Sequence, residues 1–221
     1  MHDADTAKAI LDIFQKHGHS EIDTARAYGN GSSEEMLGDL QWQKRGLTME
    51  TKYYPTAGKG VPGSWDSELR HDPEGLRKNL MKSLEALKTD KVDMWYLHGP
   101  DRTTPYEVTM KAVNDLYKEG HFKRLGISNY QAWEVSQICE MCKTNGWKMP
   151  DVYQGVYVKL KRPYTVLPSL RLIFDFQLQC SAQVCRTRAL PLLEALWDRI
   201  LQLQPSRGWV PNITIPPRRS R

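Results

Sequence analysis

Four side chains that can donate, hold or stabilise a proton follow short, strand-like stretches of the sequence. Asp23 ends one such stretch, and Tyr28 stands five residues further on in a glycine-rich loop. Lys52 closes a second, alternating stretch and His98 a third. In β/α units the catalytic groups gather at the carboxyl ends of the strands. The spacing therefore predicts one site that combines a carboxylate, a phenol, an ammonium and an imidazole.

Each of these residues also has an ordinary structural interpretation. Asp23 precedes a threonine and could cap a helix, and Tyr28 could be a packed aromatic residue. Lys52 could be a solvated strand end, and His98, which precedes Gly-Pro, could belong to a turn. Their joint occurrence at three successive strand ends favours the functional interpretation.

Helices and strands are expected to alternate as far as Tyr157. Helical periodicity marks the segments 7–17, 73–87, 105–117 and 132–145, and Ser32 or Ser33 is expected to cap one more helix. Strand-like runs lie between them at 19–23, 46–53, 92–98, 122–128 and 152–157. The loop 55–73 is long enough to be functional, and its Trp65 could line a substrate mouth or pack the loop down. This alternation predicts an α/β fold with a parallel sheet and right-handed crossovers.

The sequence resembles the aldo-keto reductases, and within them the aflatoxin-aldehyde (succinic semialdehyde) reductase branch. The resemblance is carried by I-D-T-A at Asp23, A-Y-G at Tyr28, T-K at Lys52, Y-L-H at His98, L-G-I-S-N-Y at 125–130 and V-Y-Q-G-V-Y at 152–157. It covers roughly residues 7–157, about two-thirds of the chain. It implies the (β/α)₈ TIM barrel of that family, with about strands 2–6 of the barrel present.

The resemblance implies NADPH-dependent reduction of an aldehyde or ketone, a small-molecule carbonyl substrate. Tyr28 would donate the proton and His98 would polarise the carbonyl. An ion pair with Asp23 would hold Lys52 beside Tyr28. A nearby cation favours tyrosinate, so we expect Lys52 to lower the pKa of Tyr28 from its ordinary value of about 10.

Three further residues match the family's contacts to the nicotinamide carboxamide: Ser128, Asn129 and Gln154. Ser128 or Asn129 could instead cap the following helix. The tyrosine that stacks on nicotinamide in the family, and its basic loop for the adenosine phosphates, have no in-frame equivalent after the sixth strand. We therefore expect impaired NADPH binding. The alternative function is that of a non-catalytic, truncated fragment, and a homodimer is possible only for the intact family.

The composition disfavours several other kinds of protein. The chain has 221 residues and a net charge of +5, which disfavours nucleic-acid binding. No apolar segment indicates a signal sequence or a membrane span, so a cytoplasmic location without a membrane partner is expected. Cys139 and Cys142 lie in a helical pattern without a second pair, which predicts core thiols and no metal site.

Two domains are expected, a partial barrel at 1–157 and an irregular tail at 158–221. A barrel typically needs about 250 residues, so this one is expected to be incomplete. Permitted codons for residues 189–210, read in a shifted frame, give a sequence resembling the family's sixth helix and seventh strand, so a frame shift would explain the tail. An open barrel would also leave inward side chains uncovered, namely Ile22, Met49, Leu97 and Ile127 or their strand neighbours.

Overall fold

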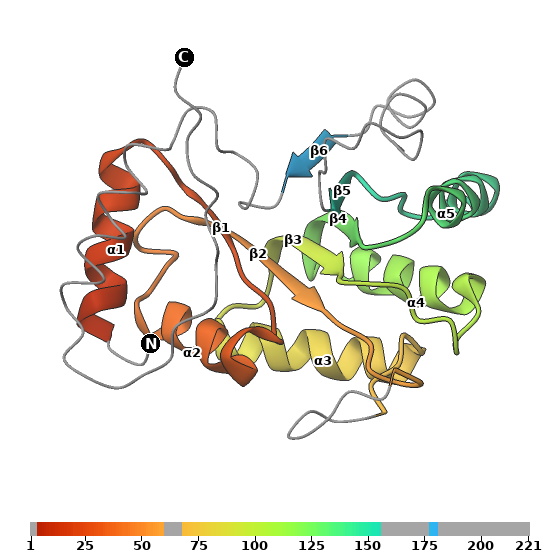
Figure 1. Ribbon diagram of the computed structural model, residues 1–221, viewed down its shortest axis with the longest axis horizontal. Helices are drawn as coiled ribbons and strands as arrows, with labels where there is room; N and C mark the ends of the chain where they lie inside the picture. Colours follow the sequence, from red (N-terminus) through yellow and green to blue (C-terminus); the bar gives the residue numbers. More distant parts are fainter. Residues whose placement is uncertain (1–3, 60–67, 156–176, 181–221) are drawn as a thin grey trace, which may run out of the picture. The chain divides into compact units, whose positions relative to one another are not determined.

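The computed structural model describes residues 4–59, 68–155 and 177–180, in which helices and strands alternate (Figure 1). The elements are α1 (Ala4–Lys16), β1 (Glu21–Asp23), η1 (Tyr28–Gly31), α2 (Ser32–Asp39), β2 (Thr48–Tyr53), α3 (Pro73–Ala86), β3 (Val92–Leu97), α4 (Tyr106–Lys118), β4 (Phe122–Ser128), α5 (Ala132–Asn145), β5 (Val152–Gly155) and β6 (Gln177–Cys180). Each strand from β2 to β5 follows a helix, which is the predicted order.

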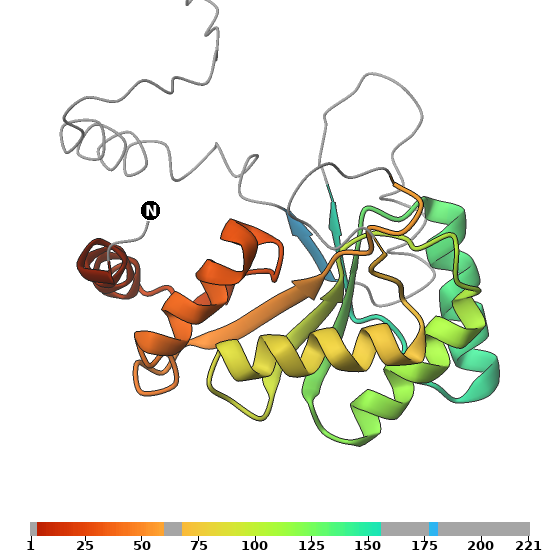
Figure 2. The same ribbon diagram turned by 90° about the horizontal axis from the view of Figure 1, so that it is seen from below.

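The strands form one sheet in the order β1-β2-β3-β4-β5-β6, and every neighbouring pair is parallel. Figure 2 shows α2, α3, α4 and α5 following one another along one side of the curled sheet. This arrangement confirms the α/β fold and, within the described residues, a partial barrel. The sixth strand was not predicted, although Gln177–Cys180 alternates polar and apolar residues, because such a short run becomes a strand only by pairing with β5.

The described residues all lie in the first of two units, Met1–Ser181. The expected boundary between residues 157 and 158 therefore stays a prediction, as does the frame-shifted origin of the tail. Trp65 also lies outside the described residues.

The main core lies between the sheet and its helices. Strand residues such as Trp95 and Leu125 pack there with helix residues such as Leu80, Val113 and Ile138. A second, smaller cluster on the opposite face of the sheet contains Met94, Tyr96 and Val152.

Of the two alternatives for the inward residues, the second holds, because Ile22, Met49, Leu97 and Ile127 all belong to or pack against the main core under the helices. Their strand neighbours are the inward residues. The sequence gives the alternation of a strand but not which of its faces meets the helices.

Helix ends agree with the predictions in part. Asp72 caps α3 by accepting a hydrogen bond from the Gly75 amide, and Pro73 is the first helical residue, as predicted. Neither Ser32 nor Ser33 caps α2, because Gly31 occupies that position. Gln131 caps α5 in a capping box, so the alternative interpretation of Ser128 and Asn129 as caps does not hold.

Cys139 and Cys142 are fully buried, which confirms their interpretation as core thiols, and burial raises their pKa values to about 11 and about 12.

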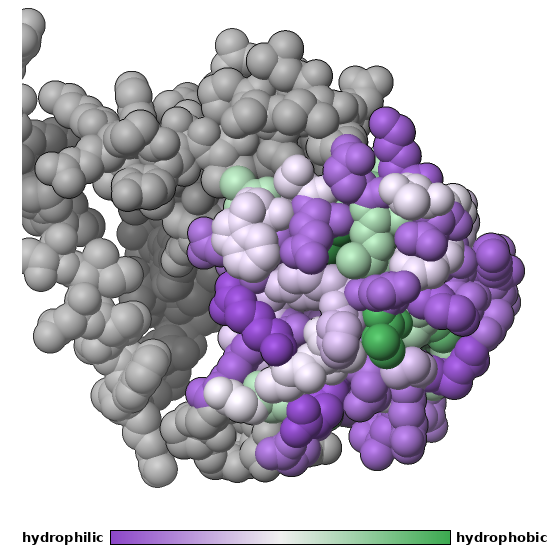
Figure 3. All heavy atoms as spheres, turned by 90° about the vertical axis from the view of Figure 1, so that its right-hand side faces the viewer, coloured by the Kyte–Doolittle hydropathy of each residue, from purple (hydrophilic) through white to green (hydrophobic). Residues whose placement is uncertain are grey.

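The side of the molecule formed by α4 and α5 is mainly hydrophilic in the described part, with small apolar spots (Figure 3). Among the described residues, no helix combines the length and the apolar character that crossing a membrane requires.

Gly38 lets α2 lie directly against the end of α3. A Cβ atom at this position would lie 2.2 Å from the backbone oxygen of Ala86. Backbone cannot move aside cheaply, so we expect Gly38→Ala to lower the free energy of unfolding by about 1–3 kcal/mol. Denaturant unfolding measures this loss.

Gly46→Ala is the matched control for Gly38→Ala. Nothing lies within 4 Å of its added Cβ, although its φ is +67°. It carries only the strain of a left-handed residue, about 1 kcal/mol. If both variants lost the same free energy of unfolding, the close approach of Gly38 to Ala86 would not be the cause of the loss in Gly38→Ala.

His71 is expected to make the fold sensitive to acid. Its side chain is 1% exposed, and neither ring nitrogen has a hydrogen-bond partner within the described residues. Burial lowers the pKa of His71 from 6.5 to about 4. As the pH falls, the unfolded chain therefore takes up a proton on His71 before the folded chain does. The contribution of neutral His71 to stability is fully present above pH 6.5 and is lost as the pH falls towards 4. We expect a loss of roughly 2–4 kcal/mol over that window.

Denaturant unfolding at several pH values tests this expectation, with His71→Phe as the comparison. His98 titrates in the same window and is present in both proteins, so their difference isolates His71. Asp101, whose pKa is lowered to about 2, changes the stability only at pH values below this window. Identical pH dependence in the two proteins would contradict the role given to His71.

Candidate active site

The parallel sheet brings the candidate residues to one end of its strands. Asp23 ends β1, Lys52 lies one residue before the end of β2, and His98 follows β3. Ser128 ends β4, and Gln154 lies one residue before the end of β5. All are at the carboxyl ends, where the sequence spacing predicted a common site.

Lys52 is the centre of this cluster. Its side chain is 0% exposed, and its ammonium group donates to the Asp23 carboxylate and, at 3.0 Å, to the Thr24 carbonyl oxygen. The same Nζ lies 5.1 Å from the centroid of the Tyr28 ring. Burial lowers the pKa of Lys52, while the charges of Asp23 and Glu50 act in the opposite direction. The predicted ion pair between Asp23 and Lys52 is therefore present in the structure.

Tyr28 lies beside Lys52 and His98 but has a different electrostatic environment from the one expected. Its ring is 41% exposed and meets the His98 ring edge-on, with 5.8 Å between centroids. Burial, and secondly the charge of Asp23, raise the pKa of Tyr28. The expected net lowering of this pKa is not found, because burial of the phenol and the charge of Asp23 outweigh the ammonium group of Lys52, which lies over the ring.

His98 lies between two tyrosine rings, those of Tyr28 and Tyr54, which are 5.8 and 5.6 Å away. Burial and the nearby charge of Lys52 lower the pKa of His98 to about 4. The imidazole is therefore neutral near pH 7 and can donate one hydrogen bond to an oxygen atom. Its Nδ1 atom is buried and has no hydrogen-bond partner among the described residues.

The three expected carboxamide contacts lie close to the four catalytic candidates. Asn129 has a left-handed backbone, with φ 63°, and its Nδ2 donates to the His98 carbonyl oxygen at 2.8 Å and to Ser128 Oγ at 3.1 Å. Gln154 is placed differently, since its Nε2 donates to Asp23 Oδ2 at 3.1 Å. Gln154 thus spans from the fifth strand to the first, which the curl of the sheet makes possible.

A second layer of buried polar residues around the site was not predicted from the sequence. Glu50 and Tyr96 are 2% and 0% exposed, and the Tyr96 hydroxyl donates to Glu50 Oε2 at 3.1 Å. Glu50 lies two residues before Lys52, so the strand period alone would have placed both on one face. Glu34 and Glu134, both fully buried, lie in the first turns of α2 and α5, where an acidic residue looks like an ordinary helix-end preference.

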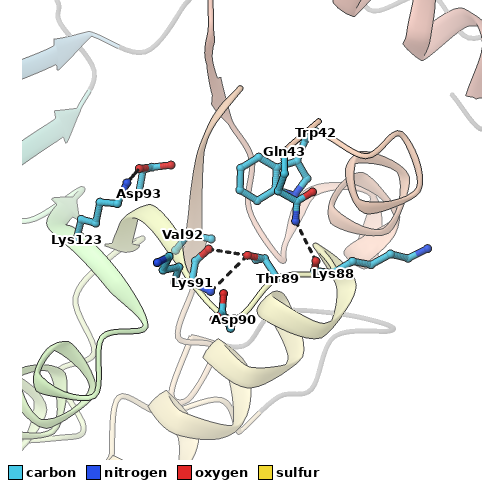
Figure 4. Close-up of a pocket in the computed structure, with 9 residues that line it drawn as sticks. All are labelled: Trp42, Gln43, Lys88, Thr89, Asp90, Lys91, Val92, Asp93 and Lys123. Carbon is cyan, nitrogen blue, oxygen red and sulfur yellow. Dashed lines mark hydrogen bonds and ion pairs between the residues drawn. The ribbon is translucent and has the colours of Figure 1, made fainter. Parts of the chain in front are cut away.

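A pocket of about 720 Å³ lies at the opposite end of the strands and is not part of this site. Its lining comes largely from Lys88–Asp93, which leads into β3, together with Trp42, Gln43 and Lys123 (Figure 4). Lys123 is paired with Asp93, and the Gln43 amide donates to the Lys88 carbonyl oxygen. These contacts tie the amino ends of the strands together.

Known proteins with similar sequences and structures agree with this fold. The family model described as "Aldo/keto reductase family" matches residues 1–170, so the chain belongs to the aldo/keto reductase family. An aldo-keto reductase of Pseudocercospora fijiensis is 55% identical over 153 residues, which is 69% of this chain and 50% of that protein. Human aflatoxin B1 aldehyde reductase member 4 is 42% identical over 155 residues, 70% of this chain and 45% of that protein.

A solved structure, that of an aldo-keto reductase from Bacillus halodurans, has the same fold with a TM-score of 0.67. Its sequence is 22% identical, and the match covers 81% of this chain and 58% of that one. The chain spans about half the length of the two relatives named above.

Proposed function

We propose that this chain carries the carbonyl-reducing site of an NADPH-dependent aldo-keto reductase that acts on small aldehydes or ketones. The observation that supports this most is the joint position of Asp23, Tyr28, Lys52 and His98 at the carboxyl ends of three neighbouring strands. Any one of them has an ordinary structural interpretation, but together they form a proton donor beside a neutral imidazole and a buried cation.

The residues assigned to the cofactor fit the nicotinamide end of NADPH. Asn129 and Gln154 use their amide nitrogens on His98 and Asp23, which leaves their amide oxygens to accept hydrogen bonds from a carboxamide NH₂. The Ser128 hydroxyl can donate to the carboxamide oxygen. In the family, the residues that bind the cofactor phosphates lie beyond the sixth barrel strand. They are therefore not among the residues assigned here to the nicotinamide.

When bound, NADPH supplies the hydride that adds to the carbonyl carbon. The residues of this chain act on the carbonyl oxygen. Tyr28 and neutral His98 donate hydrogen bonds to it, and Tyr28 gives up its proton as negative charge develops there. The Lys52 ammonium, held by Asp23, stabilises the tyrosinate that remains, and this stabilisation counteracts the raised pKa of Tyr28.

Titration of the purified chain with NADPH, followed by cofactor fluorescence, tests the proposal together with an assay of NADPH oxidation by small aldehydes and dicarbonyls. Binding in the micromolar range together with carbonyl-dependent oxidation would support the proposal and would contradict the impaired NADPH binding expected from the sequence. Absence of binding up to millimolar NADPH would contradict the proposal and would support the alternative, a non-catalytic protein.

A further inference from the structure

The loop that carries Tyr28 has an unusual backbone. Gly29, Asn30 and Gly31 follow one another with φ values of 58°, 56° and 96°, all in the left-handed region. A non-glycine residue such as Asn30 is strained there, and such strain persists only where surrounding contacts hold it. The direction of the Tyr28 ring therefore depends on the contacts that hold this loop.

The strongest of these contacts converge on Glu34, whose side chain is fully buried in the first turn of α2. Its carboxylate accepts a hydrogen bond from Thr51 Oγ1 at 2.6 Å and forms an ion pair with Arg26 Nη1 at 3.2 Å. Arg26 lies two residues before Tyr28, and Thr51 lies immediately before Lys52. One carboxylate thus joins the loop of the proton donor to the strand of the cation.

Arg26 reaches Glu34 through the inside of this loop. A Cβ atom on Gly31 would lie 2.7 Å from both Cζ and Nη1 of Arg26, so the guanidinium group packs directly against the loop backbone. The hydroxyl of Ser32 adds a hydrogen bond to the Gly29 carbonyl oxygen at 2.8 Å. The loop is therefore folded around the ion pair of Arg26 and Glu34.

The neighbouring Glu35 shows that this is not a general effect of an acidic helix start. Glu35 lies in the same turn, but its side chain is 60% exposed and its nearest oxygen is 4.0 Å from Arg26 Nη1. Both carboxylates can interact favourably with the helix dipole. Only Glu34 contacts both the tyrosine loop and β2.

We propose that Glu34 is a positioning residue that, through Arg26 and Thr51, holds the Tyr28 hydroxyl in reach of the carbonyl oxygen beside Lys52 and His98. Its effect on catalysis rests on the proposed reductase function. Its effect on the placement of Tyr28 does not depend on that function.

Glu34→Gln tests this inference, with Glu35→Gln as the matched control, since both remove one negative charge from the same helical turn. We expect Glu34→Gln to lower kcat by roughly 10–100-fold with little change in NADPH affinity, because a displaced donor impairs the chemical step. Glu35→Gln should leave kcat within about twofold, as for other exposed substitutions. Arg26→Gln removes the same ion pair from its more exposed end and should act like Glu34→Gln, which provides a second test if Glu34→Gln does not fold.

A readout that needs no turnover is the titration of Tyr28, followed by NMR of protein labelled at tyrosine Cζ and assigned with Tyr28→Phe. In the intact loop, burial and Asp23 raise the pKa of Tyr28. Release of the loop in Glu34→Gln or Arg26→Gln should move this pKa towards its ordinary value, and Glu35→Gln should not.

The two readouts separate the two proposals. A shifted titration in a chain that reduces no carbonyl would support the positioning role and contradict the proposed function. An active chain in which Glu34→Gln and Arg26→Gln match Glu35→Gln in both kcat and the titration of Tyr28 would overturn the positioning role.

Discussion

Replacing Tyr28 with phenylalanine is expected to lower kcat for carbonyl reduction by about 10²–10⁴-fold, the usual loss when a general acid is removed. The phenol is the group that can give a proton to the carbonyl oxygen, since the imidazole of His98 is neutral and is then a much weaker acid than a phenol, and Lys52 is tied to Asp23 and Thr24. Affinity for NADPH should change little, because the assigned carboxamide contacts are on other residues. Steady-state kinetics and cofactor titration measure the two effects separately.

Tyr117→Phe is the matched control, because Tyr117 is a partly exposed tyrosine on α4 that has no place in the site. It should leave both kcat and NADPH affinity unchanged. If Tyr28→Phe kept more than about a tenth of the wild-type kcat, another residue would have to supply the proton. His98 would then be the first residue to examine, because its ring lies beside Tyr28.

Sequence periodicity was enough to find the strands and their ends. β4 and α5 have the predicted bounds, and β2 and β3 differ from prediction only at their ends. This success has a simple cause, since alternation, helical period and glycine or proline boundaries are local properties of the chain. The convergence of Asp23, Lys52 and His98 followed from the strand ends, because parallel strands bring their carboxyl ends together.

The predictions that stayed open or failed concern properties that depend on neighbours far along the chain. Which face of β2 and β3 meets the helices is decided by packing, so the sequence left open whether Met49 and Leu97 or their strand neighbours face inward. The pKa of Tyr28 depends first on how deeply the ring is buried and then on the nearby charge of Asp23. The amide of Gln154 contacts Asp23 only because the sheet curls, and no local pattern encodes that curl.

Glu34 is another residue whose environment could not be predicted from the sequence. In the sequence, Glu34 and Glu35 are equally favourable charges in the first turn of a helix. Burial separates them, since Glu34 is fully buried while the side chain of Glu35 is 60% exposed. Two adjacent glutamates with one sequence interpretation therefore have different environments.

Lys52→Met is expected to lower the free energy of unfolding by roughly 3 kcal/mol. Removing one partner from a buried ion pair typically costs about 3–5 kcal/mol. The lower value applies because the Asp23 side chain is 37% exposed and water can solvate part of its charge. Glu50, which is 2% exposed, keeps its hydrogen bond from Tyr96 but loses the nearby cation.

Denaturant unfolding measures this loss, and Lys78→Met makes the same chemical change at an exposed position of α3, where it should alter stability by no more than about 0.5 kcal/mol. Asp23→Asn completes a double-mutant cycle. Because the two side chains are in contact, the cycle should give a coupling free energy of about 0.5–3 kcal/mol. If Lys52→Met were as stable as the wild type, the cost of burying the ammonium would equal what its contacts contribute. Lys52 would then be retained for its action on Tyr28, and the variant should still lose carbonyl reduction.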